Sequence, residues 1–425
     1  MSPSSHSAPT QNTASPRQTP DPATENQPAS GSAWVVFLAF LRLGLTSFGG
    51  PVAHFGYFRD EFVTRRNWLS DRNYADLMAL CQFLPGPASS QTGMAIGLAR
   101  AGYAGALAAW LGFTLPSAAA MILFALGIAT WGDFISAGFL HGLKLAAVAV
   151  VAQAVWGMGS KLCTDRTRIA LAIASACLAL LWPGSLGQIA AIAATACFGL
   201  WRLKPLTAQG QEHSHLHIPV GRPAGVVWLL AFTALLLALP VAAQAWGDNL
   251  LSMFDAFFRA GSLVFGGGHV LLPLLQAEVV PTGWVSNETF LAGYGAVQAM
   301  PGPLFTFAAF LGASIDTGIN AVSSGLWALA AIFIPSFMLV CGALPFWNQL
   351  RRNHRMRAAL EGINAGVVGL LLAALYQPVW LSAVMTPADF GLVLMAFSAL
   401  MYFRVSPWLV VVASGLAGWL LSALL

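Results

Sequence analysis

The sequences FLRLGLTSFGGP (residues 40–51) and QFLPGP (residues 82–87) decide the fold, because related sequences return about 217 residues further along the chain. The second copies read FRAGSLVFGGG (residues 258–268) and QAMPGP (residues 298–303), in the same order. Each copy places an arginine and helix-breaking residues in almost wholly apolar surroundings. Such breaks persist in a membrane only where the freed backbone groups are buried in protein or line a cavity. The paired breaks therefore predict a buried binding site between two halves.

The composition is that of a membrane protein. Hydrophobic residues make up 57% of the 425 residues and charged residues only 8%, whereas soluble globular proteins carry about 25% charged residues. We therefore predict an all-α polytopic membrane protein surrounded by lipid. The formal charge of +4 is too small to indicate a nucleic-acid partner. The five cysteines are scattered without a CxxC pair, so we interpret them as small apolar side chains and not as a metal site.

Apolar segments divide the chain into two similar halves, and most approach the roughly 20 residues that a spanning helix needs. They cover residues 34–58, 73–99, 103–130, 138–159, 168–182, 184–201, 224–246, 250–275, 288–315, 320–347, 358–377, 388–403 and 405–425. Residues 1–32 contain no Leu, Ile, Val or aromatic residue, which predicts a disordered tail. We divide the remainder into a first repeat (33–201), a linker with a connecting helix (202–249) and a second repeat (250–425).

The polar part of the linker carries three alternating histidines, His213, His215 and His217. A metal site and a solvated loop are both compatible with this pattern. Neither a cysteine nor a carboxylate cluster completes a ligand set in the linker, which favours the loop. We predict no metal ion and no cofactor for this chain.

The charges of equivalent loops predict that the two halves have opposite orientations. In three pairs of loops, one member carries three or four basic residues and the other none: 57–72 against 276–287, 348–357 against 131–138, and 160–168 against 378–388. Basic loops face the cytoplasm. The halves therefore form an inverted-topology repeat, an arrangement typical of alternating-access carriers.

The same rule indicates that some apolar segments do not cross the membrane. An odd number of crossings must separate residue 72 from residue 131, yet two apolar segments lie between them. We predict that 73–99 is a re-entrant hairpin turning at Pro85–Pro87, and that 288–315 is its counterpart. Segments 34–58 and 250–275 either span or re-enter. The lone segment 224–246 crosses only if both of them re-enter.

Arg42 and Arg259 occupy equivalent positions inside apolar segments. An arginine at membrane depth is costly, so it normally faces the protein interior and has a purpose. A guanidinium offers paired donors that suit a tetrahedral oxyanion, which favours contact with an anion. The alternative is a structural ion pair with a carboxylate such as Asp255.

Glycine and proline clusters follow each arginine and supply the remaining candidates for substrate binding. A broken helix directs its free N–H groups and the positive end of its dipole toward an anion, although glycines also serve close helix packing. A proline–glycine–proline turn cannot continue a helix, and the glutamine before it can satisfy a freed backbone group or a ligand oxygen. The candidates are Gly49, Gly50, Gln82, Pro85, Gly86, Pro87 and Ser89 in the first half, and Gly266, Gly267, Gly268, Gln298, Pro301, Gly302 and Pro303 in the second. Hydroxyl and amide groups after the first turn favour substrate contacts there.

Two histidines and two carboxylates are candidates for proton coupling. His54 and His269 follow the glycine clusters, two residues out of register with each other, and Glu61 aligns with Glu278. Histidine titrates near neutral pH. Structural histidines at helix ends and exposed interfacial carboxylates are the alternative interpretations.

These motifs resemble the chromate transporter family in its long, two-domain form. The resemblance spans residues 34–425 and rests on FLRLGLTSFGGPVAHFGYFRDEFV with QFLPGPASSQ, and on FFRAGSLVFGGGHVLLPLLQAEVV with QAMPGPLFTF. It implies a carrier of the bacterial inner membrane that expels chromate, with sulfate as the similar oxyanion, and that is driven by the proton-motive force. The family pattern extends to Pro51 beside the candidates named above.

Other functions remain open from the residues alone. A sulfate permease of similar architecture and an anion channel would use the same motifs. A membrane-embedded lipid-phosphate enzyme would need a His/Asp/Arg set at one interface. The sequence is compatible with a homodimer.

The inverted repeat makes a direct prediction about sidedness. Single cysteines introduced at positions 66 and 282 should react with membrane-impermeant reagents from opposite sides, because their loops differ in basic charge. Labelling of both positions from the same side would rule the inverted repeat out.

Overall fold

The computed structural model describes residues 31–131, 137–203 and 220–424. Within these ranges helices are the only regular secondary structure, which confirms the predicted all-α class. The three linker histidines and residues 1–30 of the predicted tail lie outside the described residues.

The first half contains seven helices among its described residues, and α8 connects it to the second half. Their bounds are α1 (Ala33–Thr46), α2 (Gly50–Arg59) with a π-helical turn (Asp60–Arg65), α3 (Asp71–Phe83), α4 (Ala88–Trp131), α5 (Ala137–Leu162), α6 (Arg166–Leu181), α7 (Ser185–Arg202) and α8 (Arg222–Trp246).

The second half repeats this order with more interruptions. Its helices are α9 (Asn249–Leu263), α10 (Leu271–Val279), α11 (Asn287–Val297), α12 (Phe307–Ser314), α13 (Ala321–Ala343), α14 (Trp347–Leu350), α15 (His354–Ala374), α16 (Leu381–Ala383), α17 (Pro387–Met401) and α18 (Pro407–Leu424). Short 3-10 turns at Gly268–Val270 and Leu304–Thr306 precede α10 and α12, and a π-helical turn (Leu375–Trp380) precedes α16.

Five stretches of the described chain are long and apolar enough to cross a membrane. They are Ala88–Thr130, Ala137–Leu162, Arg222–Trp246, Ala321–Leu350 and His354–Ala383. Large apolar side chains such as Leu181, Trp201 and Trp246 are exposed on the outer helices. Such surfaces are a liability in water and are expected against lipid. The exposed Cys177 and Cys197 also lie on outer helices, whereas Cys81 and Cys341 are buried.

The segments with breaks are shorter than a membrane span. Helix α1 has 14 residues and α9 has 15, which gives lengths of about 21–23 Å at 1.5 Å per residue, less than the ~30 Å of the hydrocarbon core. By contrast, α8 has 25 residues. These lengths favour the alternative in which 34–58 and 250–275 re-enter and α8 crosses.

The first part of α4 folds back on the second. Ala101 and Gly102 have non-helical backbone angles, and a Cβ at Gly97 would lie 2.2 Å from the carbonyl oxygen of Gly105. In a straight helix these two residues would be about 12 Å apart. Helix α3 and residues 88–100 therefore form a hairpin that ends before the long part of α4 begins. In the second half, Gly312 approaches the Ser324 carbonyl in the same way.

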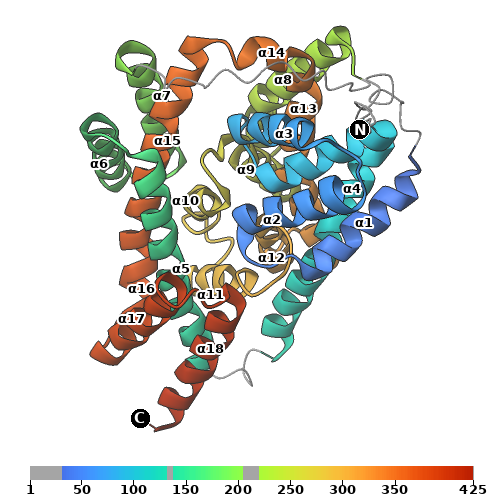
Figure 1. Cartoon of the computed structure of the whole chain (residues 1–425). Coiled ribbons are helices and arrows are strands. Elements are labelled where there is room, and N and C mark those ends of the chain that lie inside the picture. Colours follow the sequence, from blue (N-terminus) through green and yellow to red (C-terminus); the bar gives the residue numbers. More distant parts are fainter. Residues whose placement is uncertain (1–30, 132–136, 204–219, 425) are drawn as a thin grey trace, which may run out of the picture.

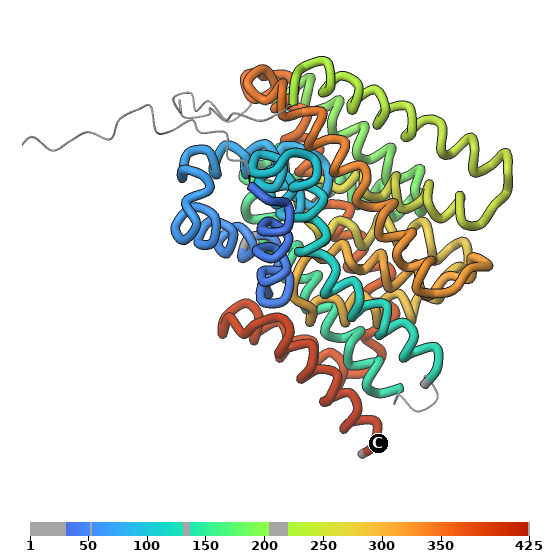
Figure 2. Tube along the Cα trace, turned by 90° about the vertical axis from the view of Figure 1, so that its right-hand side faces the viewer, coloured from blue at the N-terminus to red at the C-terminus, as the bar shows by residue number. Residues whose placement is uncertain are grey.

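Equivalent helices of the two halves run in opposite directions. In Figure 1, α4 descends to the lower end of the molecule, where α5 begins, whereas α13 and α15 meet at the upper end through α14. Figure 2 shows the same arrangement from the side, with the C-terminal helix at the lower end. The two halves are therefore inverted with respect to each other inside the chain.

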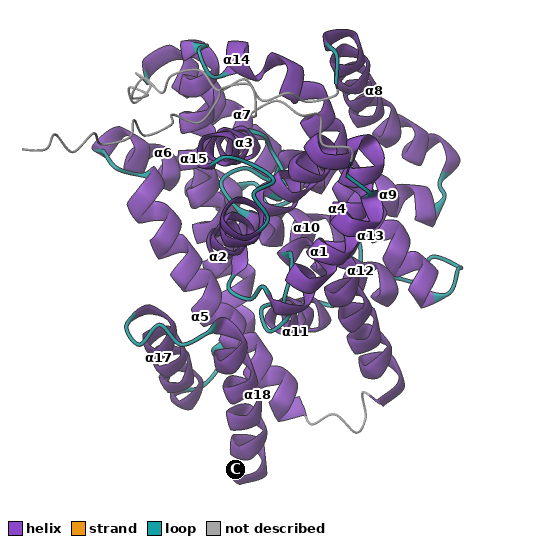
Figure 3. Cartoon of the chain, turned by 45° about the vertical axis from the view of Figure 1, so that its right-hand side comes forward, coloured by secondary structure: helices purple, strands orange, loops and turns teal. Residues whose placement is uncertain are grey.

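Each half lends a pair of helices to the other half. Helices α6 and α7 pack against α15, and α17 and α18 pack against α5, as Figure 3 shows for α5, α17 and α18. Glycines allow close approach in both places: a Cβ at Gly142 would lie 2.1 Å from the Ser414 carbonyl, and one at Gly362 would lie 2.1 Å from the Thr195 carbonyl. Small residues at such crossings are typical of helix packing in membranes.

The broken helices of the two halves interlock at the centre. The amide of Gly302, in the second proline–glycine–proline turn, donates to the carbonyl of Ser47 at the end of α1 (2.9 Å). The amide of Gly86, in the first turn, donates to the carbonyl of Val264 at the end of α9 (2.7 Å). The two bonds are related by the repeat. Each turn therefore satisfies a backbone group that the opposite half left free.

Replacing Gly86 by alanine should destabilise this interlock. Gly86 has φ +121°, and its Cβ would lie 2.5 Å from Ser336 Oγ, so we expect a loss of about 1–3 kcal/mol. Gly56→Ala in α2 is the matched control, because nothing lies within 4 Å of that Cβ and alanine favours a helix. Thermal unfolding of both purified variants is the measurement. Equal melting temperatures would contradict the role given to Gly86.

Candidate functional site

A cavity of about 400 Å³ lies beside the Ser47–Gly302 bond. The first glycine break, the second proline–glycine–proline turn, α5 and the turn between α17 and α18 form its wall. We call it the central cavity. Its lining residues are Gly49, Gly50, Pro51, Val150, Gln153, His269, Val297, Gln298, Met300, Gly302, Leu304, Leu400, Arg404, Val405, Ser406 and Pro407.

The start of α2 forms one side of the central cavity. Gly49 and Gly50 have φ values of +100° and +75°, a conformation that only glycine adopts cheaply. These angles let the chain reverse after Ser47 and start a new helix at Gly50, and no side chain caps that helix. The first N–H groups of a helix have no partner within the helix, and they carry the positive end of its dipole. The break therefore directs hydrogen-bond donors toward the cavity.

Arg404 supplies a positive charge at the cavity wall. It lies in the turn between α17 and α18 with a φ of +53°, whereas the corresponding turn between α6 and α7 has a glycine, Gly184, at positive φ. A left-handed conformation costs a non-glycine residue about 1–2 kcal/mol. Among the described residues that line the cavity, none is acidic. Its electrostatic character therefore favours an anion.

Two further polar side chains face the cavity from the second half. His269 Nδ1 lies 2.9 Å from the hydroxyl of Tyr294, which leaves Nε2 for another partner. The Gln298 side chain has its Nε2 atom buried without a hydrogen-bond partner in the described part of the chain. A buried donor without a partner is costly, and a ligand oxygen would satisfy it.

The structure separates the two predicted arginines from the cavity. Arg259 pairs with Asp255 (2.8 Å) and Glu278 (3.2 Å), so the structure favours the alternative interpretation of a structural ion pair. Arg42 is exposed and does not line the central cavity. The two arginines also differ in their surroundings, because Leu38, the counterpart of Asp255, carries no charge.

The two predicted carboxylates are held by arginines. Glu61 is buried and pairs with Arg65 (2.9 Å) and Arg66 (2.6 Å), whereas Glu278 pairs with Arg259. Both carboxylates therefore belong to ion pairs, and Glu61 is not the exposed interfacial group of the alternative interpretation.

His54 belongs to the interlock. Its ring is buried, with Nε2 3.2 Å from the Ser47 carbonyl and Nδ1 3.3 Å from Ser89 Oγ. The same Ser47 carbonyl accepts the Gly302 amide. These contacts fix His54 against the end of α1.

The first proline–glycine–proline hairpin does not line the central cavity. Gln82 is exposed and Gly86 and Pro87 are buried, while the Pro85 carbonyl accepts from Gln91 Nε2 (2.6 Å). Ser89 serves His54. The sequence favoured substrate contacts in this hairpin. The central cavity is instead lined by the second hairpin.

The remaining candidates also take separate places. Gly266 lies near Met158 and Asn364, and Gly268 lies against Leu304. Both flank Gly267, which has a φ of +141°, in the glycine break after α9. Pro301 and Pro303 flank the cavity residue Gly302. Of the predicted set, the structure thus brings together Gly49, Gly50, His269, Gln298 and Gly302 at the cavity.

Arg404, Gln153 and Ser406 are polar cavity residues that the sequence interpretation missed. Gln153 lies in the middle of a long apolar helix. Arg404 lies in a turn that we interpreted only as a reversal between two short helices. An arginine in a turn that elsewhere uses glycine was the available signal.

The chain is similar to known transport proteins over most of its length. The family model described as Chromate transporter matches residues 34–200 and 251–419. The chain belongs to the chromate transporter family. This finding confirms the resemblance and the two repeated halves, and it indicates a multi-pass membrane transporter rather than an enzyme.

Curated relatives extend this result across bacteria. The chromate transport protein of Pseudomonas aeruginosa is 30% identical over 428 residues, which is 95% of this chain and 96% of the relative. The chromate transport protein of Cupriavidus metallidurans is 25% identical over 79% of this chain and 80% of its own length. The probable chromate transport protein of Synechococcus elongatus is 25% identical over 79% and 81% of the two chains. No solved structure matches the chain.

The ion pairs of Arg259 predict a stability effect. Arg259→Gln should lower the melting temperature, because it leaves Asp255 and Glu278 close together without a cation, at a cost of about 2 kcal/mol. Arg42→Gln is the matched control and should leave the melting temperature unchanged. The double variant Arg259→Gln/Glu278→Gln should recover part of the loss. Equal melting temperatures of the two single variants would contradict the structural role of Arg259.

Proposed function

We propose that this protein is a secondary carrier that binds chromate, or the similar oxyanion sulfate, in the central cavity and exports it across the bacterial inner membrane. The proton-motive force drives the export, and the carrier thereby confers chromate resistance. Family membership and the names of the relatives support the substrate.

The observation that carries this proposal is the charge of the central cavity. A tetrahedral dianion needs several hydrogen-bond donors and no nearby carboxylate. Gly49 and Gly50 at the start of α2, Gln298 and Arg404 line a space without an acidic residue among its described lining residues. Backbone amides and a guanidinium at a helix start are the usual protein ligands of oxyanions.

The position of the cavity supports a carrier mechanism. Residues of both halves line it, and the two halves run in opposite directions around it. In carriers with inverted repeats, the site lies at the repeat interface, and rocking of one half against the other exposes it to either side. The interlock at Ser47 and Val264 is where such movement would pivot.

Three other functions predict different measurements. A sulfate permease would import the anion, and a channel would show neither saturation nor coupling to protons. A lipid-phosphate enzyme would release phosphate from lipid. Flux of radiolabelled chromate into inverted membrane vesicles, with and without a proton gradient, distinguishes these functions.

Replacing Arg404 should weaken chromate binding. Arg404→Asn removes the charge, and asparagine tolerates the left-handed conformation, so folding should persist. We expect the KM for chromate to rise by about tenfold, the effect of losing one charge-assisted hydrogen bond. Initial rates in proteoliposomes are the measurement.

Arg42→Gln is the matched control, because it removes an arginine that does not line the cavity. It should keep the wild-type KM. If Arg42→Gln raises the KM and Arg404→Asn does not, the site must be moved away from the central cavity.

A further inference from the structure

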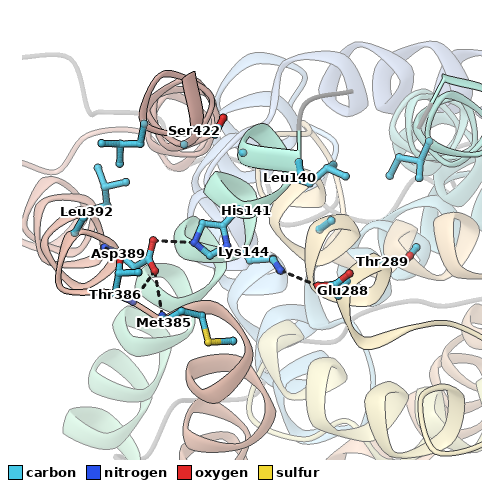
Figure 4. A pocket seen from close by; sticks show the side chains of 17 residues that line it. Leu140, His141, Lys144, Glu288, Thr289, Met385, Thr386, Asp389, Leu392 and Ser422 are labelled. Carbon is cyan, nitrogen blue, oxygen red and sulfur yellow. Dashed lines mark hydrogen bonds and ion pairs between the residues drawn. The ribbon is translucent and has the colours of Figure 1, made fainter. Parts of the chain in front are cut away.

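A second cavity of about 580 Å³ lies between α5, α11, α17 and α18. The adjoining loops 131–138 and 378–388 lack basic residues, so this end is the predicted external side, and we call the space the external pocket. Its polar and charged lining groups include His141, Lys144, Glu288, Thr289, Thr386 and Asp389. Figure 4 shows His141 beside Asp389 and Lys144 beside Glu288. Unlike the central cavity, this pocket contains carboxylates.

The pair of His141 and Asp389 closes one side of the external pocket. His141 Nε2 lies 2.8 Å from Asp389 Oδ1 (Figure 4). The other carboxylate oxygen accepts the backbone N–H groups of Met385 (3.0 Å) and Thr386 (2.9 Å) at the start of α17. Asp389 is thus fixed as part of a helix cap, whereas the His141 side chain is 29% exposed and accessible to protons from solvent.

The other charged groups around His141 come from α5 and α11. Lys144, one turn along α5, lies 3.4 Å from Glu288 at the start of α11, and the Glu288 side chain is 82% exposed. Helix α18 contributes Gly418, Leu421 and Ser422 to the wall, and α4 contributes Ile128. Among the described residues of this wall, Asp389 is therefore the carboxylate in contact with the imidazole.

The repeat places a different ion pair at the equivalent position of the opposite end. His141 corresponds to Glu361 on α15, and Asp389 corresponds to Arg168 on α6. Arg168 binds Glu361 and its own helix-capping residue Asp165. Both pairs join the two halves, but the signs of the charges are exchanged. Arginine does not lose its proton in proteins, whereas histidine changes charge between pH 5 and 8.

The two helices joined by His141 and Asp389 both reach the central cavity. Helix α5 carries His141 and, 12 residues later, Gln153 of the cavity wall, a distance of about 18 Å along the helix. Helix α17 carries Asp389 and, 11 residues later, Leu400, which precedes the Arg404 turn. The tie at one end is therefore connected through α5 and α17 to two walls of the central cavity.

We propose that the His141–Asp389 pair is the proton-binding site of this carrier, and that its protonation lowers the affinity of the central cavity for the oxyanion. This inference rests on the proposed function as an exporter. A proton from the external solvent binds the imidazole, and the resulting imidazolium is held by the Asp389 carboxylate. The charged pair holds α17 to α5, whereas the neutral pair lets α17 and the Arg404 turn take the position that binds the oxyanion, so protonation releases the oxyanion on the side from which the proton came.

The first experiment needs no oxyanion. In a variant without the five native cysteines, Tyr402→Cys carries a nitroxide spin label on the exposed residue next to the Arg404 turn. The wild-type spectrum should change between about pH 5.5 and pH 8, the range in which histidine titrates. With His141→Arg the spectrum should stay in its acid form, and with His141→Gln in its alkaline form. A wild-type spectrum without pH dependence, or one that still titrates in both variants, would overturn the proposal.

The second experiment measures linkage with sulfate, whose charge is constant over this range. Sulfate affinity of the wild type should weaken on the order of tenfold from pH 8 to pH 5.5, a coupling of ordinary size. His141→Arg should bind weakly and His141→Gln tightly at both pH values. Glu361→Gln is the matched control, because it alters the equivalent pair at the opposite end, which contains no histidine, and it should retain the wild-type pH dependence.

The two experiments separate this inference from the proposed function. If the spin label titrates through His141 but neither sulfate nor chromate binds or crosses the membrane, the proposed function fails and the proton site stands. If chromate is transported and both His141 variants keep the wild-type pH dependence of sulfate affinity, the proposed function stands and the proton site is refuted.

Discussion

The hydrogen bonds from Gly302 to the Ser47 carbonyl and from Gly86 to the Val264 carbonyl are the contacts on which the rest of this structure depends. Each glycine break and each proline–glycine–proline turn gives up helical hydrogen bonds in apolar surroundings, where an unsatisfied backbone group costs several kcal/mol. Neither half can satisfy these groups by itself in the observed geometry. The two halves must therefore be inverted and interlocked, and the central cavity lies where the interlock leaves donors free.

The repeat supplies equivalent positions, but its side chains give them different chemistry. Arg259 is held by two carboxylates, Asp255 and Glu278. In the first half, Glu61, the counterpart of Glu278, pairs with Arg65 and Arg66 instead of Arg42. Gly184 and Arg404 occupy corresponding turns, and of these two residues the arginine carries a charge. Symmetry thus builds the scaffold, and departures from symmetry give the cavity its preference for an anion.

The exchange of helical pairs between the halves connects distant parts of the molecule. Helices α17 and α18 lie on α5, and α6 and α7 lie on α15, with glycines at the crossings. The glycine crossing joins the backbones of α18 and α5, whereas α17 is tied to α5 by the His141–Asp389 pair. In the proposed coupling, a charge at the end of α5 acts on the cavity through these helices rather than through space.

The sequence by itself determined the helical class, the two halves, their opposite loop charges and the positions where helices break, because composition, basic residues and Gly or Pro act locally. Only the tertiary structure decided which breaks face a cavity. Arg42 and Arg259 look alike in sequence, yet their partners, Asp255 and Glu278 for Arg259, are set by packing. The His141–Asp389 pair joins residues 248 positions apart, and Arg404 lines a cavity together with residues of the first half. No local pattern records a contact between helices that meet only after the halves have assembled.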